Sequence, residues 1–78
     1  MRYDIYINTS VWKPLGSKDN LIDAIKVIRK NFILRAEFMI IEDDGKSQFP
    51  IIFIQNLKDF EELLEKYDLT KPKKYVKI

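Results

Sequence analysis

The 78-residue chain contains no cysteine and no histidine. Without them it cannot form a disulfide, bind a metal through thiolate or imidazole, or activate a serine or cysteine nucleophile with a histidine. Glycine is scarce, with only Gly16 and Gly45, and the sequence has no glycine-rich phosphate-binding loop. It also shows no carboxylate pair placed for general acid–base chemistry. We therefore predict a protein that is not an enzyme and that uses no cofactor and no metal.

Long apolar runs are missing as well. Charged residues make up 33% of the chain, and no apolar run approaches the ~20 residues that span a bilayer. The first four residues lack the apolar core of a secretory signal. We expect no membrane segment and a cytoplasmic protein. The length predicts a single domain over residues 1–78 whose small core favours self-association or a partner.

The hydrophobic periodicity predicts the order βαββαβ. Gly45, in the run 42–46, indicates a hairpin turn, while Pro14 and Gly16 indicate a loop over residues 9–17. Ser17 and Asn56 are the expected N-caps of the two helices. The expected strands are 3–8, 33–42, 48–55 and 74–78, and the expected helices are 18–31 and the segment after Asn56. No internal repeat is evident. We predict an α+β, ferredoxin-like fold: a four-stranded antiparallel sheet with two helices on one face. Because Pro50 lacks an amide hydrogen, the strand order around it stays open.

The predicted central hairpin is apolar on both faces, unlike a half-exposed strand pair. If the helices cover one face, the other exposes a patch that extends to Tyr6 and comprises Met39, Ile41, Ile52 and Ile54. Such a patch is typical of an interface, and a homodimer packed sheet against sheet is its simplest form. The alternative is that the 9–17 loop or the C-terminal tail covers these residues.

The 9–17 loop contains the only tryptophan, Trp12, followed by Lys13. Tryptophan is enriched at binding hot spots, but a small protein can also use it to close its core. The sequence favours a non-enzymatic protein-interaction or regulatory module, inhibitor-like or adaptor-like, that binds a protein partner or itself. Its predicted contact residues are Tyr6, Trp12, Lys13, Met39, Ile41, Ile52 and Ile54.

An RNA- or DNA-binding module is the alternative prediction. The segment Ile5-Tyr6-Ile7-Asn8 resembles the first-strand motif of the RNA-recognition motif, in which an aromatic ring stacks on a base. Gln48 and Pro50, however, fall where that family has further aromatic residues, so we do not assign it. The residues predicted for this alternative are Tyr6, Arg35, Lys73 and Lys74. Basic residues form two groups, at 26–30 and at 71–77, and each group either contacts phosphates or is simply solvated.

Overall fold

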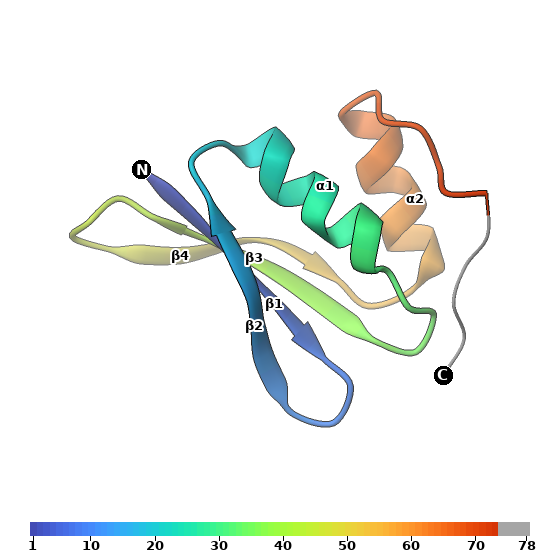
Figure 1. Cartoon of the computed structure of the whole chain (residues 1–78), viewed down its shortest axis with the longest axis horizontal. Coiled ribbons are helices and arrows are strands. Elements are labelled where there is room, and N and C mark those ends of the chain that lie inside the picture. Colours follow the sequence, from blue (N-terminus) through green and yellow to red (C-terminus); the bar gives the residue numbers. More distant parts are fainter. Residues whose placement is uncertain (74–78) are drawn as a thin grey trace.

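A computed structural model describes residues 1–73 and shows an antiparallel sheet covered by helices on one face (Figure 1). The elements are β1 (Arg2–Asn8), β2 (Trp12–Lys18), α1 (Leu21–Asn31), β3 (Glu37–Asp43), β4 (Gln48–Ile54) and α2 (Leu57–Lys66). The four strands lie in the order β2-β1-β3-β4, with every neighbouring pair antiparallel. The predicted α+β class and four-stranded antiparallel sheet are confirmed.

The predicted 9–17 loop is wrong, because most of it forms β2. This strand pairs with β1 from Tyr3↔Lys18 to Asn8↔Trp12. Pro14 and Gly16 are compatible with a strand here because β2 lies at the sheet edge and its pairing is interrupted by a bulge. The described elements therefore run ββαββα, and the ferredoxin-like order βαββαβ is not confirmed. The predicted strand 74–78 lies outside the described residues.

Both helices begin with the same local sequence, Asn-Leu-x-Asp. The Asn56 side chain accepts a hydrogen bond from the Asp59 amide at 2.8 Å, which confirms the predicted cap of α2. The matching cap of α1 is Asn20, whose side chain accepts from the Asp23 amide at 2.9 Å. Ser17, the residue predicted for that role, lies in β2 instead.

The chain repeats one unit, a hairpin followed by a helix, although its sequence shows no evident repeat. Each outer strand has a proline followed by an unpaired bulge residue, Leu15 in β2 and Ile51 in β4. The bulges lie beside equivalent positions of the central strands, next to the pair Ile5↔Ile40. The two halves are thus related by a local pseudo-two-fold axis near this pair.

The core lies between the helices and the sheet. Phe32, which follows α1, stacks on Phe60 of α2 with ring centroids 3.9 Å apart, and on Phe38 of β3 at 5.6 Å. The buried residues are Ile5, Ala24, Ile25, Ile28, Phe32, Ala36, Phe38, Ile40, Ile54, Phe60, Leu63 and Leu64. The stacked rings join both helices to a central strand, and no helix of residues 1–73 lies over the opposite sheet face (Figure 1).

The structure corrects the predicted faces of β4. Ile54 pairs with buried Phe38, and Ile52 pairs with buried Ile40. Cross-strand partners project to the same side of a sheet, so Ile52 and Ile54 face the helices rather than the open side. Because β4 is apolar on both faces, its sequence pattern did not determine which face is buried.

Candidate functional site

The candidate site is the sheet face away from the helices, which we call the open face. Its centre is apolar: Tyr6 of β1 pairs with Met39 of β3, and Ile41 lies two residues further along β3. All three side chains are half-buried. Pro14 pairs with Tyr6 and Pro50 pairs with Ile41, so the apolar surface continues onto both outer strands.

Two aromatic rings from opposite edges of the sheet meet over this centre. Trp12 of β2 and Phe53 of β4 have ring centroids 6.1 Å apart, with their planes tilted by 44°. We call this pair the aromatic bridge. Despite their mutual contact, Trp12 is 40% exposed and Phe53 is 49% exposed. A large apolar side chain that stays exposed in this way indicates a contact surface more than a completed core.

The two edges of the sheet are poorly suited to strand addition. Each outer strand contains a proline, Pro14 or Pro50, which has no amide hydrogen to donate, and each is interrupted by a bulge. Prolines and bulges are devices by which proteins block edge-to-edge pairing. Contacts to another molecule are therefore expected through the side chains of the open face rather than by extension of the sheet.

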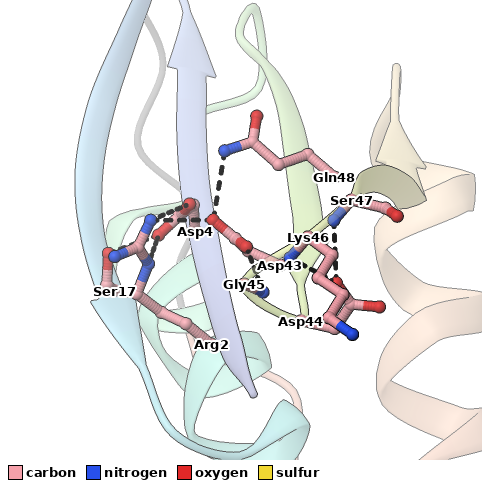
Figure 2. Close-up of polar contacts among 9 residues, drawn as sticks. All are labelled: Arg2, Asp4, Ser17, Asp43, Asp44, Gly45, Lys46, Ser47 and Gln48. Atoms are coloured by element: carbon pink, nitrogen blue, oxygen red, sulfur yellow. Dashed lines mark hydrogen bonds and ion pairs between the residues drawn. The ribbon is translucent and has the colours of Figure 1, made fainter.

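A network of hydrogen-bonded polar side chains crosses one end of the open face and joins all four strands (Figure 2). Ser17 of β2 donates to Asp4 at 2.6 Å. The Arg2 guanidinium contacts Asp4 at 2.9 Å through Nε and Asp43 at 2.9 Å through Nη2. Gln48 of β4 completes the network by donating to Asp43 Oδ2 at 3.1 Å. The side chains of Asp4 and Asp43 are only 13% and 12% exposed, and each carboxylate is paired with the Arg2 guanidinium.

The neighbouring β3–β4 turn confirms the predicted hairpin. The Asp43 carboxylate accepts from the Gly45 amide at 2.8 Å, and Asp44 Oδ1 accepts from the amides of Lys46 and Ser47, each at 2.8 Å. These backbone donors are the largest cause of a pKa below the ordinary value for each aspartate. The Arg2 pKa is raised, first by its hydrogen bond to Asp4.

At the other end, Asn8 of β1 donates to Glu37 of β3 at 2.9 Å. The open face is therefore an apolar centre between two hydrogen-bonded polar ends. This layout, an apolar middle with a polar rim, is that of protein interfaces.

The structure brings together four of the seven residues predicted to contact a protein partner: Tyr6, Trp12, Met39 and Ile41. Lys13 does not join them, because it pairs with Ile7, which packs against the core. Ile52 and Ile54 lie on the helix side, and Ile54 is buried.

Sequence reasoning missed Phe53, which forms half of the aromatic bridge. The only available signal was that its strand is apolar on both faces, which did not distinguish Phe53 from its neighbours.

The residues predicted for nucleic-acid binding are dispersed. Tyr6 lies on the open face, while Arg35 is exposed in the turn that precedes β3. Lys73 is exposed at the end of the described chain, and Lys74 lies outside it.

Between residues 1 and 73 no polar or charged residue is buried, and no group of three or more acidic side chains could hold a metal ion. None of the helices in this part is long and apolar enough to cross a membrane. No protein-family model matches the chain, and comparisons with curated proteins and with solved structures gave no match.

Proposed function

We propose that the protein is a small non-enzymatic interaction module that binds protein through its open sheet face, and that its first partner is a second copy of itself. The exposed aromatic bridge is the observation that carries this proposal. Two aromatic side chains that remain largely accessible over an apolar centre supply the anchors on which protein interfaces depend.

The composition of the apolar surface supports pairing. An aromatic side chain presents about 150–250 Å², so Trp12 at 40% exposed and Phe53 at 49% exposed leave roughly 200 Å² of side-chain surface accessible. The half-buried residues of the apolar centre and the exposed prolines of the two outer strands extend this surface across the open face. A single copy contains everything such a contact needs, because a two-fold interface uses the same patch twice.

The test is the molar mass of the protein measured by light scattering on a sizing column. We expect the wild type to elute with the mass of a dimer. Phe53→Glu places a charge on the aromatic bridge, and we expect it to elute as a folded monomer because a buried unpaired charge disfavours the contact.

Phe49→Glu is the matched control, since it makes the same change on the same strand. Phe49 pairs with Glu42 on the helix side of the sheet and is 57% exposed. This variant should keep the dimer mass. A monomeric wild type would contradict self-association, as would a dimer that survives Phe53→Glu. If Phe49→Glu alone dissociated the dimer, the interface would lie elsewhere.

A further inference from the structure

The basic end of α1 and the segment after α2, which are far apart in the sequence, meet on one surface of the molecule. Arg29 of α1 donates to the Thr70 hydroxyl at 3.2 Å and to the Thr70 carbonyl at 3.5 Å. These bonds hold the segment after α2 against the end of α1. One hollow there is lined by Lys26, Arg29, Lys30, Thr70, Lys71 and Pro72. A second hollow shares Lys26 and Lys30 and adds Lys18, Asp23 and Val27.

Basic side chains outnumber acidic ones around these two hollows. Lys71 lies 3.8 Å from Glu61, but Lys18, Lys26 and Lys30 have no ion-pair partner among residues 1–73. Basic residues in the last turn of a helix suit the helix dipole, which accounts for Arg29 and Lys30. Lys18 lies in β2 and Lys26 precedes the last turn, so the dipole does not account for either of them.

The rest of the helical layer has the opposite sign. α1 carries three basic residues and one acidic residue, whereas the adjacent α2 carries four acidic residues and two basic ones. A polyanion approaching the helices would thus be directed to the α1 side. The exposed aromatic side chains Trp12, Phe49 and Phe53 lie on β2 and β4 and line neither hollow. Stacking on unpaired bases, which single-stranded binding uses, therefore has no aromatic platform among the residues of 1–73 that line these hollows.

We propose that the basic surface formed by Lys18, Lys26, Arg29, Lys30 and Lys71 binds the phosphate backbone of a nucleic-acid duplex, without reading its sequence. Lysine and arginine side chains contact phosphates in this mode, and the affinity comes largely from the release of counterions. The surface is separate from the open face, so the molecule could hold a duplex and a protein partner at once.

The experiment is fluorescence anisotropy with a labelled DNA duplex of mixed sequence, titrated with the whole chain at several salt concentrations. Binding should weaken steeply with salt, with a slope of roughly −4 in log K against log salt for about four phosphate contacts. A second duplex of unrelated sequence should bind with the same affinity. The double variant Lys26→Glu/Lys30→Glu should bind at least about 10-fold more weakly at low salt.

The matched control is Lys46→Glu/Lys58→Glu, which changes net charge by the same amount. Lys46 is exposed in the β3–β4 turn and Lys58 is exposed on α2, and neither lines the two hollows. The control should lose much less affinity than the α1 variant. Equal losses would overturn the proposed surface, since net charge alone would then explain binding. Absence of duplex binding at low salt, or equally effective competition by polyglutamate, would overturn the assignment to nucleic acid.

Discussion

At the scale of single residues, two neighbouring aspartates fix the β3–β4 hairpin through different contacts. Asp44 accepts from two amides of the turn, whereas Asp43 accepts from one amide and also faces Arg2 and Gln48. The run Asp-Asp-Gly predicts the turn but not the partners of its carboxylates. The structure shows that the Asp43 side chain is only 12% exposed, because it belongs to the network of polar side chains across the sheet.

These contacts give folding a pH dependence with a definite sign. The folded-state pKa values of Asp43 and Asp44 lie below the ordinary value of 3.8. A carboxylate with a lowered pKa stabilises the fold above its ordinary pKa, and this contribution is lost as the pH falls through the lowered value. The protein should therefore lose thermal stability below about pH 4.

The variant Asp44→Asn isolates one of these carboxylates. We expect it to melt at a lower temperature than the wild type at neutral pH, and the difference should shrink as the wild-type carboxylate becomes protonated. Thermal unfolding followed by circular dichroism across the acid range measures this. Asp19→Asn is the control, because the exposed Asp19 side chain has no hydrogen bond within residues 1–73. A constant difference between Asp44→Asn and wild type at every pH would contradict the account.

At the scale of the elements, β4 shows where sequence reasoning fails. An alternating strand reveals its buried face, but residues 49–54 are uncharged and apolar throughout. The register with β3 and the bulge at Ile51 decide that Ile52 and Ile54 face the helices. The same ambiguity hides Phe53, which lies between them on the open face.

The adjacent variants Ile52→Glu and Phe53→Glu test this assignment. Ile52 packs against the buried core, so a carboxylate there should destabilise the fold by about 2 kcal/mol or more. Phe53 is half exposed, so Phe53→Glu should cost the monomer little more than its contact with Trp12, about 1 kcal/mol. Urea unfolding of both variants, compared under conditions where each is monomeric, gives the two values. If Phe53→Glu proved the more destabilising, the faces of β4 would be reversed.

β2 was missed for a different reason. Pro14 and Gly16 are strong loop signals, and only an outer strand with a bulge tolerates both. The helices were easier to predict because their apolar spacing is regular and α2 begins directly after a good capping residue. The expected first cap, Ser17, was wrong because Ser17 belongs to the missed strand, and Asn20 caps α1 instead.

At the scale of the whole molecule, an apolar open face and a basic helical surface lie on different sides of one sheet. The sequence predicted the α+β class, the sheet with its helices and four residues of the open face. It did not show that the basic end of α1 meets the segment 70–72, because Thr70 lies 41 positions after Arg29. Nor could it show that rings from the two outer strands meet, since that contact depends on the strand order.

The most direct test of pairing through the open face is the fluorescence of Trp12, the only tryptophan and one half of the aromatic bridge. If the open face pairs with a second copy, Trp12 becomes shielded from water in the dimer. Its emission should then shift to longer wavelength as the wild type is diluted from dimer to monomer. An emission that is red-shifted and the same at all concentrations would show that Trp12 stays in water, and would contradict pairing through the open face.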